Sequence, residues 1–263
     1  MKCSATVLAA GFAGLMLTSS LPAAATVVLV KTNLGNFEVN LFDQTTPLTV
    51  ANFLTYVKNG SYNDTLFHRS LPGFVLQGGG FKYSGNNTAP FTATAVLAPV
   101  KNEVLYSNLR GTIAMAKQQG KPDSATNQWF INLADNSQNL DTQNSGFTVF
   151  GQVTGNGMEI IDAIAKLPTN LATGFAEVPL RNYTAADVQA KVPVAKANLI
   201  QIESISVINN DPASAAALKP VQNTLIHQKK NDDSSSGGSL GWFSLLAVAA
   251  LASCRRRSSR LAR

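Results

Sequence analysis

The sequence predicts a mainly β protein in which many short strands form a closed barrel, accompanied by two helices. Short runs rich in β-branched and aromatic residues alternate with turn signals from residue 26 to residue 207. Only two stretches, 46–58 and 158–167, space their apolar residues as helices do. No internal repeat is visible, and many short strands with two helices favour a closed β-barrel.

The first expected elements are a hairpin and a helix. Residues 26–32 are β-branched, an Asn-Leu-Gly-Asn turn signal follows, and residues 37–42 alternate apolar with polar side chains. Thr46 and Pro47 then have the residue types that begin helices, with threonine as the cap and proline at the first position. Apolar residues recur at helical spacing up to Asn59-Gly60, which ends the helix. We expect this helix to close one end of the barrel.

The remaining elements are shorter and less regular. Residues 81–110 are rich in loops, and we expect strands at 111–117, 129–133, 149–153 and 199–207, with a helix at 158–167 whose Ile160, Ile161 and Ile164 face inward. The alternation of the last strand changes phase near Glu203-Ser204, which indicates a β-bulge. Residues 168–197 carry three prolines and no clear periodicity, so we expect a long surface excursion with at most a short helix around 185–190.

The N-terminal 25 residues have the pattern of a secretory signal peptide. A single Lys2 precedes an apolar run from Val7 to Leu17, and a polar break leads to small residues at 23–25. A short membrane anchor is the alternative, but the apolar run is too short to span a bilayer easily. We therefore expect cleavage after Ala25 and a folded domain over residues 26–210.

The C-terminal end has a second targeting pattern. We expect a polar linker at 211–239, followed by a hydrophobic segment with a basic end at 240–263. An apolar run closed by arginines is typical of a stop-transfer segment. With Gly237-Gly238 before it, this end resembles bacterial Gly-Gly C-terminal sorting tails, which implies membrane capture, proteolysis near the glycines and export to the surface or medium. A plain C-terminal anchor is the alternative, and in either case we expect the protein in the periplasm, on the outer surface or secreted.

The composition of the region between these ends supports neither a nucleic-acid-binding protein nor a disulfide-stabilised one. Of the 21 basic residues, Lys2 and five arginines after residue 254 lie in the ends, which leaves 15 basic against the 15 acidic residues. The high pI therefore does not indicate nucleic-acid binding. Both cysteines, Cys3 and Cys254, also lie in the ends, so disulfides do not stabilise the domain. About 185 residues can bury an adequate core without them.

Residues 67–80, Phe-His-Arg-Ser-Leu-Pro-Gly-Phe-Val-Leu-Gln-Gly-Gly-Gly, are the most specific motif of the chain. Two extended segments around a Leu71-Pro72-Gly73 turn would bring Arg69, Phe74 and Gln77 together. The motif resembles that of the cyclophilins, the prolyl peptide isomerases, which reads Phe-His-Arg-x-x-x-x-Phe-x-x-Gln-Gly-Gly. The resemblance covers about residues 27–207 and implies a closed eight-stranded antiparallel β-barrel capped by two α-helices.

The motif suits the chemistry of peptide-bond rotation. The barrier is about 18–20 kcal/mol because the nitrogen shares its lone pair with the carbonyl, and X–Pro bonds populate both isomers. A donor aimed at the nitrogen, an apolar pocket for the ring and a polar hold on the neighbouring carbonyl suffice, so we expect no metal or other cofactor. By the resemblance Arg69 is the catalytic donor. One charge-assisted hydrogen bond is worth about 1.5–3 kcal/mol, which is one to two decades in rate, so the pocket must contribute.

The resemblance also assigns the substrate-binding residues. Phe74 and Val75 line the pocket for the proline ring, and Gln77 binds the substrate backbone. Without the motif, core packing would be the better interpretation of every apolar member. The further positions are Ala116 and Lys117 along the groove, Gln128 as a substrate contact, and Phe130, Leu140 and Phe147 as pocket walls.

Four of these neighbouring positions depart from the familiar family pattern. Val75 replaces a methionine, Lys117 an asparagine and Phe147 a histidine or tyrosine. Asn139 replaces a tryptophan or phenylalanine, which argues against tight binding of cyclosporin. None of these changes removes the donor, the pocket or the polar hold.

Other chemistries find little support in the sequence. The histidines are His68, which is structural in the family motif, and His227, and they suggest neither a metal site nor a Ser-His-Asp arrangement. The glycines at 78–80 are followed by no Lys-Ser/Thr pair, as a phosphate loop would require. We expect a monomer that acts on proline-containing peptides and unfolded exported proteins. The alternatives are a proline-peptide binding module with little turnover and a surface-displayed interaction protein that uses residues 168–197.

Overall fold

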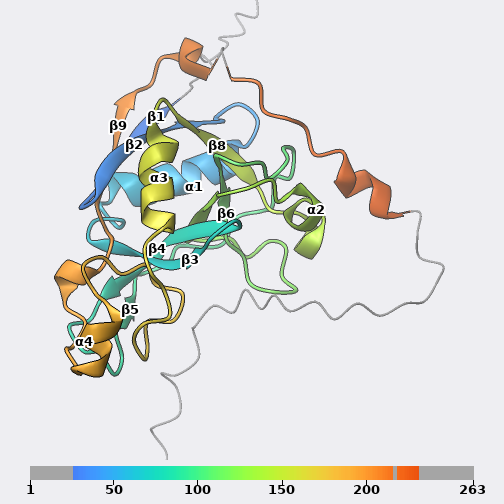
Figure 1. Ribbon diagram of the computed structural model, residues 1–263. Helices are drawn as coiled ribbons and strands as arrows, with labels where there is room; N and C mark the ends of the chain where they lie inside the picture. The colour runs from blue at the N-terminus through green and yellow to red at the C-terminus, as the bar shows by residue number, and fades with distance from the viewer. Residues whose placement is uncertain (1–25, 216–217, 231–263) are drawn as a thin grey trace, which may run out of the picture.

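The computed structural model describes residues 26–215 and 218–230, and it contains one antiparallel sheet that closes on itself (Figure 1). Nine strands follow the order β3-β9-β1-β2-β8-β6-β7-β4-β5, and a β3–β4 pairing closes the first eight into a barrel. β5 lies outside the barrel as a lone extra strand, which the sequence did not predict. The strands are β1 (Val27–Thr32), β2 (Gly35–Leu41), β3 (Thr65–Leu71), β4 (Val75–Tyr83), β5 (Phe91–Ala93), β6 (Thr112–Met115), β7 (Trp129–Asn132), β8 (Val149–Thr154) and β9 (Gln201–Asn209).

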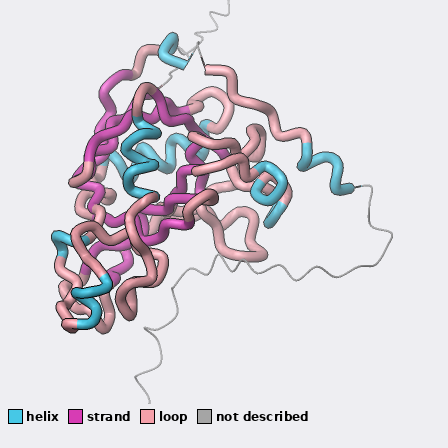
Figure 2. Tube along the Cα trace, in the orientation of Figure 1, coloured by secondary structure: helices cyan, strands magenta, loops and turns pink. Residues whose placement is uncertain are grey.

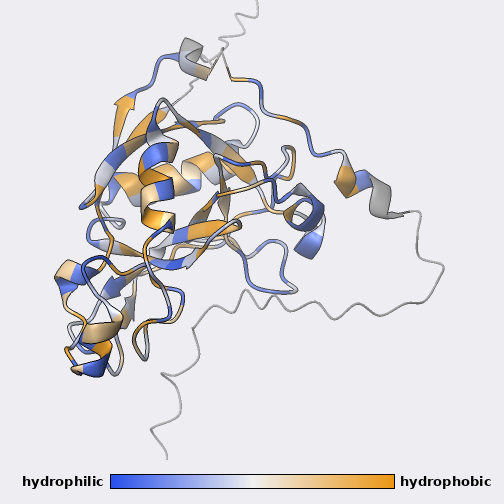
Figure 3. Ribbon diagram, in the orientation of Figure 1, coloured by the Kyte–Doolittle hydropathy of each residue, from blue (hydrophilic) through white to orange (hydrophobic). Residues whose placement is uncertain are grey.

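Two helices pack on the barrel and complete its core, while the others in the described ranges are short (Figure 2). α1 brings Phe53 into the barrel, where its ring lies 5.2 Å from that of Phe150 and 6.4 Å from that of Trp129. α3 buries Ile161 and Ile164 and turns hydrophilic residues outward (Figure 3). The helices are α1 (Pro47–Lys58), α2 (Ser137–Leu140), α3 (Gly157–Ala165), α4 (Ala185–Gln189) and the 3-10 turns η1 (Gln143–Ser145), η2 (Lys196–Asn198), η3 (Pro212–Ala215) and η4 (Leu225–Lys230).

The predicted bulge in the closing strand is present. Ser204 pairs with Lys31 and Ile202 pairs with Thr32, so Glu203 is the extra residue between them. The N-terminal hairpin also has the predicted boundaries within one or two residues. The expected strand at 111–117 is shorter, because the chain leaves the ladder after Met115.

The cap of α1 differs from the predicted one. Thr46 occupies the cap position, but its hydroxyl donates to the Phe42 carbonyl at 3.2 Å and accepts from none of the first helical N–H groups. The Glu103 carboxylate accepts instead from the backbone N–H groups of Leu48 at 3.2 Å and Thr49 at 2.8 Å. A negative charge at a helix N-terminus also suits the helix dipole. The cap comes from a residue 55 positions away from Leu48, so no local pattern could have revealed it.

We predict that Glu103→Ala lowers the free energy of unfolding by about 1 kcal/mol, as other cap losses do. Glu103→Gln should lose less, because its amide oxygen can still accept one of the bonds. Urea unfolding of the three proteins measures this difference. Equal stability of the alanine variant and the parent protein would show that Glu103 contributes nothing to the helix.

Residues 168–197 form the expected excursion, with α4 at the predicted place, but it is not only a surface feature. Phe175, Val178 and Leu180 are buried in a cluster of their own with Leu66 of β3 and with Leu199, which precedes β9. Irregular backbone can bury side chains without any sequence period, which is why the sequence suggested an exposed loop. In Figure 1 the excursion and α4 lie beside β5, and the rings of Phe91 and Phe175 are 5.9 Å apart.

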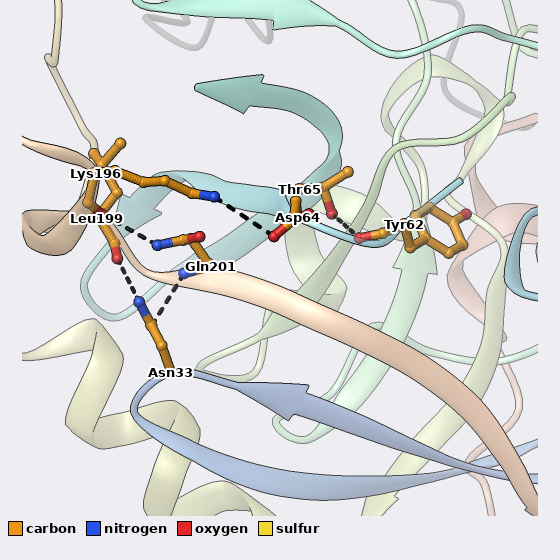
Figure 4. A network of polar contacts seen from close by, with 7 residues as sticks. All are labelled: Asn33, Tyr62, Asp64, Thr65, Lys196, Leu199 and Gln201. Carbon is orange, nitrogen blue, oxygen red and sulfur yellow. Dashed lines mark hydrogen bonds and ion pairs between the residues drawn. The ribbon is translucent and has the colours of Figure 1, made fainter. Parts of the chain in front are cut away.

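The end of the excursion is tied to the barrel by a polar network (Figure 4). The Asn33 amide donates to the Leu199 carbonyl at 2.9 Å and accepts from the Gln201 backbone N–H at 3.1 Å. Lys196 approaches Asp64 at 3.7 Å. These contacts join the excursion to the β1–β2 turn and to the start of β3, so its position is fixed relative to the barrel.

Part of the expected linker also contacts the domain. Tyr106 pairs with Gln222, and the buried Asn223 side chain donates to the Asp141 carbonyl at 2.9 Å. The expected signal peptide at 1–25 and hydrophobic segment at 240–263 lie outside the described residues. Within the described ranges, no helix has both the length and the apolar character needed to cross a membrane.

Candidate active site

The signature motif forms the hairpin of β3 and β4. The Phe74 N–H donates to the Leu71 carbonyl at 2.9 Å, and Gly73 adopts a φ of 74° in the turn. This turn sets the pairing register, which places Arg69 directly opposite Gln77. The sequence therefore located the two polar members of the candidate site correctly relative to each other.

Arg69 is held on one edge of its guanidinium. Its Nε donates to the Glu177 carboxylate at 2.7 Å, and its side chain is only 13% exposed. Its Nη1 is buried and has no hydrogen-bond partner in the described part of the chain. A buried donor without a partner is costly, and a bound acceptor such as a peptide group would satisfy it.

The expected pocket walls form an apolar cluster separate from the barrel core. Val75, Phe130, Leu140 and Phe147 pack together, with Phe74 and Ala116 partly exposed at the margin. The rings of Phe130 and Phe147 meet edge to face with centroids 5.8 Å apart. The walls come from β4, β7, α2 and the segment before β8, and β7 places Phe130 opposite Gln77. The predicted apolar residues are therefore brought together next to the predicted polar ones.

Gln77 and Gln128 form the polar margin of the site. The Gln77 side-chain N–H group donates to the Gln128 amide oxygen at 2.9 Å, and the Gln77 oxygen is buried without a partner within the described residues. Gly80 permits this pair, because a Cβ there would lie 2.5 Å from the Gln128 side chain. The free acceptor of Gln77 suits a backbone N–H of a bound peptide.

Lys117, which the resemblance places along the peptide groove, points its ammonium at the 144–146 turn. Its side chain is buried, and its ammonium donates to the carbonyls of Asn144 at 2.9 Å and Gly146 at 2.5 Å. The same nitrogen lies 4.8 Å from the centre of the Phe147 ring. Lys117 thus contacts Phe147, one of the expected pocket walls. Asn139 is exposed and contributes no aromatic surface to the rim.

Burial lowers the pKa of Lys117 to about 8, partly offset by the charge of Asp123. The unfolded chain therefore binds more protons than the folded one between about pH 8 and 10.5, so this side chain makes the free energy of unfolding rise with pH in that window. We predict that Lys117→Met removes the rise. Urea unfolding of both proteins at pH 7.5 and pH 10 measures the difference, and an identical pH response would contradict the lowered pKa.

His68 packs against an aromatic ring of β4. Its ring is half-buried and lies edge to face with Phe81 at 4.8 Å. Burial lowers the pKa of His68 to about 4, so its imidazole is neutral near pH 7. Across the described residues, no three His, Cys, Asp or Glu side chains gather as metal ligands would.

Two supports of the site had no signal in the sequence. Glu177 reaches Arg69 from 108 residues away, within a segment that matches no motif. A buried amide network holds the hairpin tip, since the Asn136 side chain donates to the Phe74 carbonyl at 2.8 Å and to the Asn132 oxygen at 2.7 Å. Asparagines in loops are usually solvated, so only the folded structure reveals this role.

Comparisons with known proteins show which proteins have a similar sequence and fold. The family model "Cyclophilin type peptidyl-prolyl cis-trans isomerase/CLD" matches residues 27–190. A peptidyl-prolyl cis-trans isomerase of Acinetobacter baylyi is 42% identical over 181 residues, which is 68% of this chain and 92% of the relative. Peptidyl-prolyl cis-trans isomerase A of Dickeya dadantii is 45% identical over 181 residues, covering 66% and 90%. A solved cyclophilin type isomerase of Cryptosporidium parvum shares the fold, with a TM-score of 0.50, 23% identity and coverage of 71% of this chain and 99% of that one.

Proposed function

The chain belongs to the cyclophilin-type peptidyl-prolyl cis-trans isomerases, and from this premise we propose that the Arg69 site isomerises X–Pro bonds in proteins exported from the cell. The assignment of the site depends on one observation: the Nη1 of Arg69 is buried and has no hydrogen-bond partner in the described residues. Arg69 lies on β3, which pairs with β4, the strand that supplies Val75 and Gln77. A donor beside an apolar cluster is what rotation about a prolyl bond requires.

The proposed mechanism follows from the planarity of the peptide group. Twisting the bond returns the lone pair to the proline nitrogen, and the Arg69 guanidinium donates to that nitrogen in the twisted state. The proline ring packs against Phe130, Leu140 and Phe147, which withdraws the more dipolar planar amide from water. Gln77 accepts from a substrate N–H and fixes the peptide direction. No bond is made or broken, so no nucleophile takes part.

The affinity for peptides should be low. One buried ring and a few hydrogen bonds give about 4–6 kcal/mol, which corresponds to a dissociation constant of about 0.1–1 mM. The test of the site is cis–trans exchange in an Ala-Pro tetrapeptide, followed by NMR with and without the protein. Binding without faster exchange would favour a proline-peptide binding module instead.

The proposal of export is supported by residues 1–25 and 237–263. The first have the pattern of a cleaved signal peptide, and the second that of a Gly-Gly sorting tail of bacterial secreted proteins. On this proposal the C-terminal segment contacts the membrane before processing, and the mature protein is a monomer. Mass spectrometry of protein from the producing cells tests it: a mature chain from Thr26 to near Gly237-Gly238 supports export and tail removal, and an uncut chain in the cytoplasm contradicts them.

A further inference from the structure

Glu177 contacts the arginine of the site from a part of the chain that belongs to no signature motif. Its carboxylate accepts the Nε–H of Arg69 at 2.7 Å, and its backbone carbonyl accepts the N–H of the next residue, Ser70, at 2.6 Å. One residue of the excursion therefore binds both the side chain of Arg69 and the backbone beside it.

The backbone at Glu177 is itself fixed. The side chains of Phe175 and Val178 on either side are each 1% exposed, and they anchor the segment in the cluster with Leu66 and Leu199. Glu177 has a φ of 61°, a left-handed conformation that is uncommon for non-glycine residues. The carboxylate is thus presented to Arg69 by a rigid support.

The edge of the guanidinium that Glu177 binds decides which donors remain for a substrate. A guanidinium is planar and carries five N–H groups in fixed directions. An acceptor at Nε restricts the orientation of that plane and leaves the Nη groups unbound by Glu177. The buried Nη1, which has no acceptor among the described residues, is one of them.

We propose that Glu177 is a positioning residue that holds the Arg69 guanidinium with its Nη donors directed at the bound X–Pro peptide. The proposal rests on the catalytic role proposed above for Arg69. It assigns a function to the excursion at 168–197, which carries the positioning carboxylate into the site. Without Glu177, the Arg69 side chain is ordered only when the transition state forms. The loss of its conformational entropy then adds to the activation free energy, which lowers kcat.

The first test compares Glu177→Ala and Glu177→Gln with the parent protein in the tetrapeptide assay. We expect the alanine variant to lose about tenfold in kcat/KM, equivalent to about 1.4 kcal/mol, with the loss mainly in kcat. The glutamine variant should stay within about threefold of the parent, because its amide oxygen can accept the same hydrogen bond. Asp162→Ala is the matched control, since it removes the carboxylate of another 2.7 Å arginine pair, with Arg110, at similar exposure.

The second test asks whether Glu177 acts through Arg69. In an Arg69→Ala background, Glu177→Ala should cause no further loss, whereas equal losses in both backgrounds would overturn the proposal. Unchanged activity of the single Glu177→Ala variant would overturn it as well. A readout independent of activity is the Nε–H signal of Arg69 in NMR, which should be protected from exchange in the parent and lose protection in Glu177→Ala. Protection that persists contradicts positioning, while full activity of Arg69→Ala contradicts only the role of the arginine.

Discussion

Replacing Arg69 by alanine is expected to lower kcat/KM for an Ala-Pro tetrapeptide by about 10- to 100-fold, because one charge-assisted hydrogen bond is worth about 1.5–3 kcal/mol. The bond is made to the proline nitrogen only when the peptide is twisted, so the loss should appear in kcat more than in KM. The fold should remain, since the side chain is not part of the barrel core and its ion-pair partner Glu177 is 40% exposed and can be solvated.

Arg69→Lys is the informative companion of this variant. It keeps the positive charge but replaces the planar group, which offers donors on two sides, by a single ammonium. Lysine cannot bind Glu177 and a substrate with the same fixed geometry, so we expect it to restore less than half of the lost activation free energy. Arg110→Ala serves as the control, because it removes an ion-paired arginine outside the candidate site. If Arg69→Ala keeps the parent rate, the catalytic assignment of this residue is wrong.

Local sequence patterns were sufficient for most of the barrel. The hairpin of β1 and β2 was predicted from alternation and a turn signal, and the bulge at Glu203 from a phase change, because side chains on a strand alternate with a period of two. β5 was missed because its three residues are too few for a pattern. The buried cluster of Phe175, Val178 and Leu180 was missed because irregular backbone imposes no period.

Contacts within a short segment of the site could be predicted from the sequence, and contacts between distant segments could not. Arg69 and Gln77 lie in one hairpin, so their pairing follows from a short segment of sequence. Glu103 and Glu177 act on groups 55 and 108 residues away, and a surface carboxylate has no sequence feature that names its partner. Lys117 was assigned to the groove by its place in a motif, but burial and two backbone carbonyls turn its ammonium toward the 144–146 turn.

Replacing Phe130 by alanine is expected to have the second large effect, on both stability and activity. The result distinguishes a pocket wall from a residue that only packs in the core. Phe130→Ala should lower the free energy of unfolding by about 3–5 kcal/mol, as large deletions of buried aromatic side chains do. The ring is 1% exposed and packs on Phe147, so its loss leaves a cavity beneath the position proposed for the proline ring. We therefore expect kcat/KM of the folded protein to fall tenfold or more, which is about 1.4 kcal/mol, in addition to the loss of stability.

Phe150→Ala supplies the comparison that makes this result decisive. Phe150 is fully buried in the core of the barrel, next to the apolar cluster that contains Phe130. Its ring lies 5.2 Å from that of Phe53. Its deletion should cost a similar free energy of unfolding but leave kcat/KM of the folded protein within about threefold of the parent. Urea unfolding and tetrapeptide exchange on both variants measure the two quantities, with Phe130→Leu and Phe150→Leu as milder replacements if an alanine variant does not fold. Parallel losses of kcat/KM in the folded proteins at the two positions would contradict a specific role of Phe130 as a pocket wall, because a residue of the barrel core would then have the same effect.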